Sequence, residues 1–252
     1  MLTKSEIKYY ASLLKKKSRL EERKFLIEGK RIVEEGLKSS YKCETVIISF
    51  HFNEANPEYV ESLNNRGFNL QVLNSKDFEK LCDTDNPQGI AAVFEIPDAH
   101  KNSSSFDLSV ALEDIADPGN AGTIIRTCDW FGIKNVIFSE NSVDLYNSKV
   151  IRSSMGSIFH VNTKQSLDFL SDIQEMKKEG YSIICADMKG ENIFNFRPKK
   201  PSVVIFSSEA NGPSDAILKL SDKVISIPRF GNAESLNVAT ASAVVISELV
   251  RH

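Results

Sequence analysis

Three polar loops in the second half of the chain carry the residue types that could do chemistry. They read DPGNAG (117–122), SSEANG (207–212) and PRFGNAES (228–235), and each follows a run of apolar residues typical of a buried strand. Ligands of open α/β sheets bind at the carboxyl ends of the strands. We therefore expect the amide, hydroxyl, carboxylate and guanidinium groups in and after these loops to form the functional site.

The first loop leads into a helix that carries Arg126 among apolar residues. Asn120 is a good N-cap for that helix. The loop has two glycines, does not read GxGxxG, and no Walker lysine follows it, which excludes a dinucleotide or P-loop fingerprint. Taken alone, Asn120 is equally a plain cap, and Arg126 is equally a surface or salt-bridging arginine.

The other two loops carry Glu209 and Ser235, and Asn237 follows the third loop by two residues. Glu209 follows the apolar run 203–206, where a carboxylate is unfavourable unless it has a partner. It could instead be the anion at a helix N-terminus. The final helix is predicted to start at Ser235, with Ser235 as its cap and Asn237 in its first turn. A simpler interpretation is that Ser235 and Asn237 only cap this helix and that its small residues let it pack tightly on another helix.

The elements that must position these loops alternate between strand and helix, which predicts an α/β layer structure. The polar, Ser-rich stretch PDAHKNSSSFD divides the chain into residues 1–96, a linker at 97–107, and residues 108–252. Strands are predicted at 25–29, 44–50, 69–73, 88–96, 108–115, 135–139, 181–188, 201–206 and 223–228. Helices are predicted at 4–20, 30–40, 56–67, 75–82, 123–132, 147–159, 166–180 and from 235 onward.

Charge is unevenly distributed along the chain. Residues 1–31 hold ten Lys and Arg against four Glu, a net charge of +6, whereas the remainder holds 21 basic and 30 acidic residues, a net charge of −9. A basic segment on an acidic body indicates a phosphate-attracting patch. A solvated amphipathic helix would have the same composition.

Composition excludes several classes of protein. No run approaches the roughly 20 apolar residues of a membrane span, and the N-terminus lacks the apolar core of a secretory signal. The four cysteines form no CxxC pair and the four histidines are scattered, so we expect no metal site. We expect a reduced, cytoplasmic protein.

Taken together, the three loops resemble the three motifs of the SpoU-TrmH family, RNA ribose 2′-O-methyltransferases that use S-adenosyl-L-methionine. The matching stretches are DPGNAGTIIRTCDWFGI (117–133), VVIFSSEANG (203–212) and IPRFGNAESLNVATASA (227–243), with KVIRSSMGSIFHV (149–161) in the family's middle region. RLEERKFLIEGKRIVEEGL (19–37) and NPQGIAAVF (86–94) are similar to the family's substrate-binding domain. Three motifs in order make the resemblance specific.

The resemblance implies a fold and an assembly. Residues 108–252 would form a parallel sheet with helices on both faces and a C-terminal trefoil knot, which periodicity alone would argue against. Residues 1–96 would form a smaller α/β RNA-binding domain, similar to a ribosomal protein. The family is dimeric through its C-terminal helix, where small side chains allow close approach, so a homodimer is expected.

The resemblance also implies the site residues. At the methyl-transfer site it places Asn120, Arg126, Glu209, Ser235 and Asn237. Against the cofactor it places Phe206, Ser207, Ser208, Glu209, Gly212, Ile227, Pro228, Phe230, Ser235 and Leu236. Because arginine is essentially always protonated, we expect Arg126 to clamp the adjacent phosphate, while that phosphate or a water accepts the proton of the ribose hydroxyl.

The second motif departs from the family pattern, which usually reads Gly-x-Glu-Gly after the strand. Ser207 and Ala210 stand where the family has glycine. A side chain at position 207 would crowd a backbone that must approach the cofactor closely. Ser207 is expected to fit if its φ is negative.

The predicted substrate is RNA, contacted through the basic residues of the first domain. These are Lys15, Lys16, Lys17, Arg19, Arg23, Lys30 and Arg31. Ribosomal RNA of the large subunit is favoured by analogy with relatives that carry such a domain, and transfer RNA is the alternative. A ribosome-assembly factor without catalysis and a generic nucleotide-binding α/β enzyme are the competing hypotheses.

Overall fold

The computed structural model describes residues 2–97 and 107–251, so most of the linker predicted at 97–107 lies outside the described residues. The chain divides into two compact units. Unit 1 comprises residues 1–100 and 146–159, and unit 2 comprises residues 101–145 and 160–252. Residues 146–159 lie between two strands of unit 2 in the sequence but belong to unit 1. The domain boundary predicted at residues 97–107 placed this segment in the second domain.

Unit 1 is built on a four-stranded sheet of order β1-β4-β2-β3. β4 pairs antiparallel with β1 and β2, whereas β2 and β3 are parallel. The strands are β1 (Lys24–Glu28), β2 (Cys43–Ser49), β3 (Leu70–Leu73) and β4 (Ile90–Glu95). The helices are α1 (Lys4–Ser12), α2 (Lys16–Glu22), α3 (Lys30–Lys38), α4 (Phe50–Ala55), α5 (Pro57–Asn65), α6 (Ser75–Glu79), α8 (Ser148–Ser154) and the short η1 (Ser157–Phe159).

The sequence located the four strands of unit 1 but joined two of its helices into one and missed a third. The helix predicted at 4–20 is broken at residues 13–15 into α1 and α2, with buried Leu13 as the C-cap of α1. α4 was not predicted. It begins where the predicted strand 44–50 ends, because the Ser49 hydroxyl accepts the N–H of Phe52 and caps a new helix.

Residues 146–159 complete an aromatic core in unit 1. The ring of Tyr146 lies 4.5 Å from that of Phe25. The centroid of the Phe159 ring lies 5.1 Å from the ring centroid of Tyr41 and 5.5 Å from that of Phe94. All of these except Tyr41 are at most 9% exposed. Aromatic pairs at these distances stabilise beyond the area that they bury, so the segment is part of the unit 1 core.

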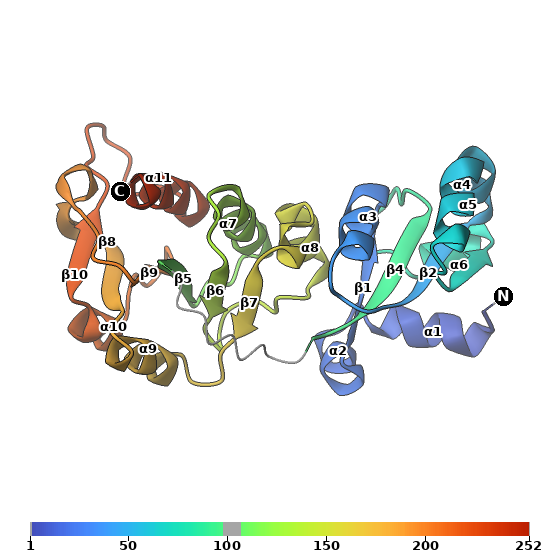
Figure 1. The fold of residues 1–252 in the computed structure, drawn as a ribbon, viewed down its shortest axis with the longest axis horizontal. Coiled ribbons are helices and arrows are strands. Elements are labelled where there is room, and N and C mark those ends of the chain that lie inside the picture. The colour runs from blue at the N-terminus through green and yellow to red at the C-terminus, as the bar shows by residue number, and fades with distance from the viewer. Residues whose placement is uncertain (1, 98–106, 252) are drawn as a thin grey trace. The chain divides into compact units, whose positions relative to one another are not determined.

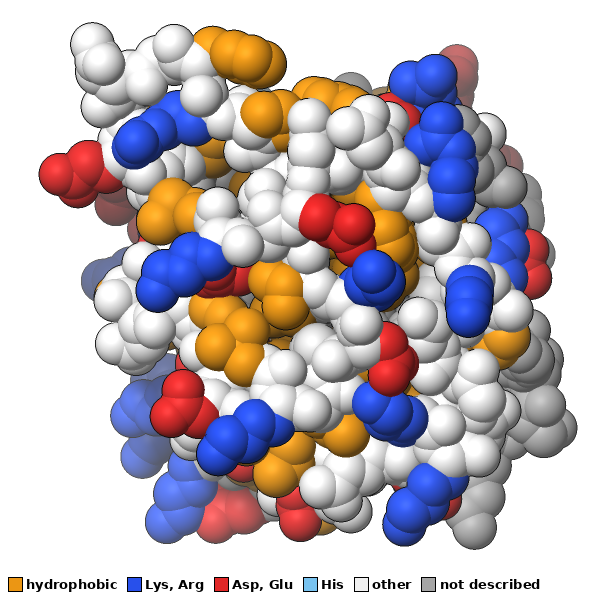
Figure 2. Space-filling view, turned by 90° about the vertical axis from the view of Figure 1, so that its left-hand side faces the viewer, with side chains coloured by type: hydrophobic (Ala, Val, Ile, Leu, Met, Phe, Trp, Pro, Cys, Tyr) orange, Lys and Arg blue, Asp and Glu red, His pale blue; other side chains and the backbone are white. Residues whose placement is uncertain are grey.

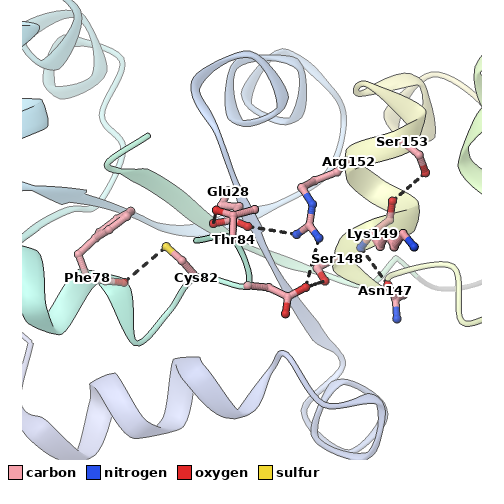
Figure 3. Close-up of polar contacts among 10 residues, drawn as sticks. Glu28, Phe78, Cys82, Thr84, Asn147, Ser148, Lys149, Arg152 and Ser153 are labelled. Atoms are coloured by element: carbon pink, nitrogen blue, oxygen red, sulfur yellow. Dashed lines mark hydrogen bonds and ion pairs between the residues drawn. The ribbon is translucent and has the colours of Figure 1, made fainter. Parts of the chain in front are cut away.

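A polar network holds α8 against β1 (Figure 3). Arg152 donates to Oε1 of Glu28 at 3.1 Å and to Oδ2 of Asp83 at 3.3 Å. The hydroxyl of Ser148 donates to the same Asp83 oxygen at 2.7 Å, and that of Thr84 donates to Oε2 of Glu28 at 3.1 Å. Because the side chain of Glu28 is only 9% exposed, its charge depends on these donors.

Replacement of Arg152 by alanine is therefore expected to destabilise unit 1 by about 2–3 kcal/mol, below the range of about 3–5 kcal/mol for a fully buried pair because the arginine is partly exposed. The matched control is Lys149→Ala, an exposed cation of the same helix, which should leave stability unchanged. Amide hydrogen exchange of β1 under native conditions measures the effect on this unit. Equal exchange in the two variants would contradict the role of Arg152.

Unit 2 is built on a six-stranded sheet of order β10-β8-β9-β5-β6-β7, in which every pairing is parallel. The strands are β5 (Leu108–Glu113), β6 (Asn135–Phe138), β7 (Asn162–Gln165), β8 (Ser182–Asn192), β9 (Ser202–Ser207) and β10 (Lys223–Ser226). The helices are α7 (Pro118–Trp130), α9 (Phe169–Lys178), α10 (Asp215–Leu220), α11 (Val238–Val250) and the short η2 (Ile193–Asn195). Figure 1 shows α7 and α11 on one face of this sheet and α9 and α10 on the other, so the expected parallel sheet with helices on both faces is confirmed.

Alternating residues of the central strands bury both faces of this sheet. Ala111, Ile183, Cys185, Val203 and Ile205 pack with residues of α9 and α10 in one core cluster. Strand β7 was not predicted, because its sequence NTKQ is polar and its burial is partial. It forms only because residues 162–165 pair in register with β6. Central strands are visible in the sequence, whereas an edge strand of this kind is not.

Candidate functional site

The three polar loops meet at the carboxyl edge of the unit 2 sheet. The side-chain nitrogen of Asn237 donates to Oδ1 of Asn120 and to Oε1 of Glu209, both at 3.0 Å. The same Glu209 oxygen accepts the backbone N–H of Val238 at 2.7 Å. One hydrogen-bonded cluster thus joins a residue of each predicted motif, and the three residues are hereafter the Asn120–Glu209–Asn237 cluster.

The cap of α11 fixes the orientation of the Asn237 amide. Its Oδ1 accepts the backbone N–H groups of Ala239 and Thr240, so its NH₂ group must point toward the other two loops. Ser235 was predicted to be this cap, which is wrong: the helix starts at Val238 and Asn237 is its N-cap. The N-terminal N–H groups of α11 are thus shared between Asn237 and Glu209.

The cap of α7 was also predicted incorrectly. Asp117, not Asn120, is the N-cap, and its Oδ1 accepts the N–H of Asn120 at 2.8 Å. Pro118 occupies the first helical position, where a missing N–H does no harm. Because Asp117 performs the capping, the side chain of Asn120 is available to Asn237.

A cavity of about 630 Å³ lies beside the second and third loops. Its lining includes all ten residues that the resemblance places against the cofactor, from Phe206 in β9 to Leu236 before α11. The volume suits a ligand of cofactor size. Hydrophobic side chains gather between basic and acidic ones on the β10 side of the molecule (Figure 2). That these residues bind a cofactor stays a prediction.

Sequence reasoning missed the part of the cavity formed by β8 and α11. Ala186, Asp187 and Met188 of β8 and Val238, Ala241 and Val245 of α11 also line it. Asp187 receives the N–H of Lys189 on Oδ1, and its other oxygen has no partner among the residues that the structure describes. The signal was present in part, because Asp187 directly follows the apolar run of residues 183–186 in β8.

Arg126 lies outside both the cluster and the lining of the cavity. Its side chain is exposed on α7 and pairs with nothing in the described part of the chain. Arg126 follows Asn120 by six residues of one helix, so it is displaced by about 9 Å along the axis and rotated by about 120° from it. The guanidinium is therefore free to bind a group supplied from outside the chain.

Ser207 satisfies the condition set by its departure from the family pattern. The non-glycine residues with positive φ in the described chain are Arg23, Asp114 and Met155, so Ser207 does not need the freedom of glycine. Its hydroxyl donates to Oε2 of Glu113 at 2.8 Å. Because Glu113 is not among the residues that line the cavity, the Ser207 hydroxyl is directed to the sheet.

The basic residues predicted to bind RNA differ in their availability. Lys15, Lys16, Lys17 and Arg31 are exposed. Lys30 is exposed but donates to Asn56 and lies 4.8 Å from the ring of Tyr59. The remaining two serve the fold of unit 1: Arg23 donates to the carbonyls of residues 96 and 97, and Arg19 is 3% exposed with a bond to the Leu13 carbonyl.

The cysteines are poor nucleophiles and poor ligands. Burial raises the pKa of the Cys43 thiol to about 12 and that of the Cys185 thiol to about 12. Burial also raises the pKa of the Cys82 and Cys128 thiols well above the usual range. Among the residues that the structure describes, no group of three or more His, Cys, Asp or Glu side chains could hold a metal ion.

Thiol alkylation at pH 8 is expected to be about 1,000-fold slower for native Cys43 and Cys185 than for the urea-unfolded chain, because the thiolate is the reactive form. The neutral thiols contribute stability that is present below pH 9 and lost as the pH rises toward 12. Iodoacetamide labelling followed by peptide mass analysis measures the rates. Fast labelling of either thiol in the folded protein would contradict this assignment.

Comparisons with known proteins match two family profiles to this chain. The sequence profile of the SpoU rRNA Methylase family matches residues 107–247, and that of the MRM3-like substrate binding domain matches residues 4–92. No helix in residues 2–97 or 107–251 is long and apolar enough to cross a membrane.

Two relatives and one solved structure illustrate the similarity. RlmP of Bacillus subtilis, a 23S rRNA (guanosine(2553)-2′-O)-methyltransferase, is 31% identical over 245 residues, covering 97% of this chain and 95% of the relative. A 23S rRNA (uridine(2479)-2′-O)-methyltransferase of Streptomyces viridochromogenes is 32% identical over 174 residues, covering 66% of this chain and 61% of the relative. The AdoMet-bound rRNA methyltransferase of Sinorhizobium meliloti superposes with a TM-score of 0.87 at 27% identity, covering 100% of this chain and 96% of that one. With a family profile matched over more than half of its length, the chain belongs to the SpoU rRNA Methylase family.

Proposed function

We propose that this protein transfers a methyl group from S-adenosyl-L-methionine to a ribose 2′-hydroxyl of large-subunit ribosomal RNA. The observation that carries the proposal is the Asn120–Glu209–Asn237 cluster, which joins the three motif loops beside the cavity. The relatives named above act on 23S rRNA at different nucleotides. The proposal therefore names the class of RNA and the reaction.

The residues of the cavity suit this cofactor. The ionisable residues that line it are Asp187, Glu209, Arg229 and Glu234, three acids and one base, which favours a ligand that carries a positive sulfonium. The cofactor supplies a methyl group that is already electrophilic, so no metal is required. Phe206, Ile227 and Leu236 would contact its apolar parts, and the free oxygen of Asp187 would accept a hydrogen bond from one of its donors.

The residues around the cluster would align the RNA ribose. The amide of Asn120 and the hydroxyl of Ser235 would hold ribose oxygens by hydrogen bonds, whereas the Asn237 amide, whose N–H groups and oxygen are bonded within the chain, would hold Asn120 and Glu209 in position. Alignment of this kind can supply about 7–11 kcal/mol of the barrier. Arg126 would clamp the neighbouring phosphate with two parallel hydrogen bonds. That phosphate or a water would accept the proton of the hydroxyl, because a guanidinium remains protonated.

Unit 1 would bind the RNA through its exposed basic residues. Lys15, Lys16, Lys17 and Arg31 are exposed, and phosphate contacts of this kind supply most non-specific affinity for RNA. Arg19 and Arg23 are not included in this surface, because their guanidinium groups bond backbone carbonyls of unit 1. Lys30 remains a candidate for RNA binding, but its ammonium group would first have to break its hydrogen bond to Asn56.

We also propose three further features of the family for this chain. The C-terminal residues would form a trefoil knot, and two copies would associate through α11, whose Ala241, Ala243 and Ser247 are partly exposed. The protein would work in the cytoplasm, in keeping with four free cysteines. Sedimentation equilibrium tests the dimer, since a monomeric mass at micromolar concentration would exclude it.

Methyl incorporation from labelled S-adenosyl-L-methionine tests the reaction. Ribosomal and transfer RNA from cells that lack this gene are presented side by side, as purified RNA and as ribosomal particles. The proposal expects label in 23S rRNA alone, at a 2′-hydroxyl. Label in transfer RNA alone would show that the substrate is transfer RNA and not ribosomal RNA. Absence of label from every RNA and particle would overturn the proposal.

A further inference from the structure

We propose that Glu113 is a positioning residue that holds both ends of the loop of residues 207–214, hereafter the cofactor loop, in the form that accepts the cofactor. The proposal rests on the function proposed above, because it takes the cavity to be the cofactor site. It assigns a role to a buried carboxylate that the reaction does not use. It also explains why serine is suitable at position 207.

Glu113 ends β5 in the middle of the sheet and is only 8% exposed. It stands directly opposite Ser207 in the parallel pairing of β5 and β9. A carboxylate in such a place is unfavourable unless donors surround it. Its donors are Ser207, the last residue of β9, and Ser214 at the far end of the cofactor loop.

The two ends of the cofactor loop bond the same carboxylate oxygen. The hydroxyl of Ser207 donates to Oε2 of Glu113 at 2.8 Å, and the backbone N–H of Ser214 donates to it at 3.2 Å. The backbone N–H of Ser208 also donates to the Glu113 carbonyl at 3.0 Å. A single buried charge thus fixes where the loop leaves β9 and where it enters α10.

Between these ends the loop lines the cavity with Ser208, Glu209, Gly212 and Pro213. Fixing both ends limits the conformations that the intervening residues can adopt before the cofactor binds. A preorganised loop loses less conformational entropy on binding and so binds more tightly. With glycine at position 207, as in the family pattern, the hydroxyl donor would be lost and the backbone would gain freedom.

The cofactor dissociation constant, measured by calorimetry, tests the clamp. Glu113→Ala should raise it about tenfold, because hydrogen bonds to a charged acceptor are among the stronger ones. Glu113→Gln keeps an acceptor and should restore most of the affinity. Ser207→Ala should weaken binding in the wild-type background and have no further effect in the Glu113→Ala background, as expected for coupled residues. The kcat of Glu113→Ala at saturating cofactor should stay within about twofold of wild type.

Ser166→Ala is the matched control. Ser166 is a buried serine of unit 2 whose hydroxyl, like that of Ser207, donates to a carboxylate, that of Asp172 at 2.6 Å, but neither Ser166 nor Asp172 lines the cavity. Amide exchange at residues 208–214 adds a readout that needs no cofactor: Glu113→Ala should accelerate it and Ser166→Ala should not. Unchanged affinity and exchange in the Glu113 and Ser207 variants would overturn the clamp. If the wild type binds no cofactor, the proposed function fails, while faster exchange would still establish that Glu113 orders the loop.

Discussion

Arg126→Ala is expected to lower methyl transfer by at least about 100-fold, while the dissociation constant of S-adenosyl-L-methionine stays within about twofold of wild type. The guanidinium is exposed and has no partner in the described chain, and it does not line the cavity. Its removal therefore leaves the fold and the cofactor site intact. The variant loses the bidentate hydrogen bonds from the guanidinium to a phosphate beside the reacting ribose.

Two further variants make this test specific. Arg126→Lys keeps the positive charge but loses the planar fork, so it should recover only part of the rate. Lys178→Ala removes an exposed cation from α9 of the same unit and should transfer methyl groups normally. Single-turnover rates at saturating cofactor measure the step directly. A wild-type rate for Arg126→Ala would remove this residue from the proposed site.

Glu209→Ala is expected to lower kcat/KM by at least about 100-fold and to weaken cofactor binding as well. Its carboxylate accepts the N–H of Val238 and the amide of Asn237. Removal leaves the first N–H of α11 without its acceptor and frees Asn237 from one of its two fixed partners. Residues on both sides of the cavity then lose their alignment, and small displacements at a reacting centre reduce rates by about 100-fold.

The conservative variant separates charge from geometry. Glu209→Gln keeps an oxygen for the N–H of Val238, so the cap of α11 should persist and the loss of kcat/KM should be smaller than for alanine. Helix N-termini favour a negative charge by about 0.3–1 kcal/mol, which sets the stability difference expected between the two variants in urea unfolding. If Glu209→Gln were as inactive as Glu209→Ala with a normal melting temperature, the charge itself would be required.

The sequence determined the α/β class, the strands that are buried and the three loops that carry the site. Apolar runs end at Glu113, Ser207 and Ile227, and ligands of parallel sheets bind where strands end. The resemblance of the three loops to the SpoU-TrmH motifs named the ten predicted cofactor-site residues, all of which the structure places around one cavity. Motif order added the family and the reaction, which hydrophobic periodicity could not supply.

Only the tertiary structure decided which groups pair. Glu209 meets Val238 and Glu113 meets Ser214 across 29 and 101 residues of sequence, separations over which local preferences carry no information. The direction of Arg126 depends on where α7 begins, because each residue turns the helix by about 100°. Residues 146–159 belong to unit 1 because their aromatic rings fill its core. Packing and long-range hydrogen bonds are properties of the folded chain, so they become visible only when distant segments meet.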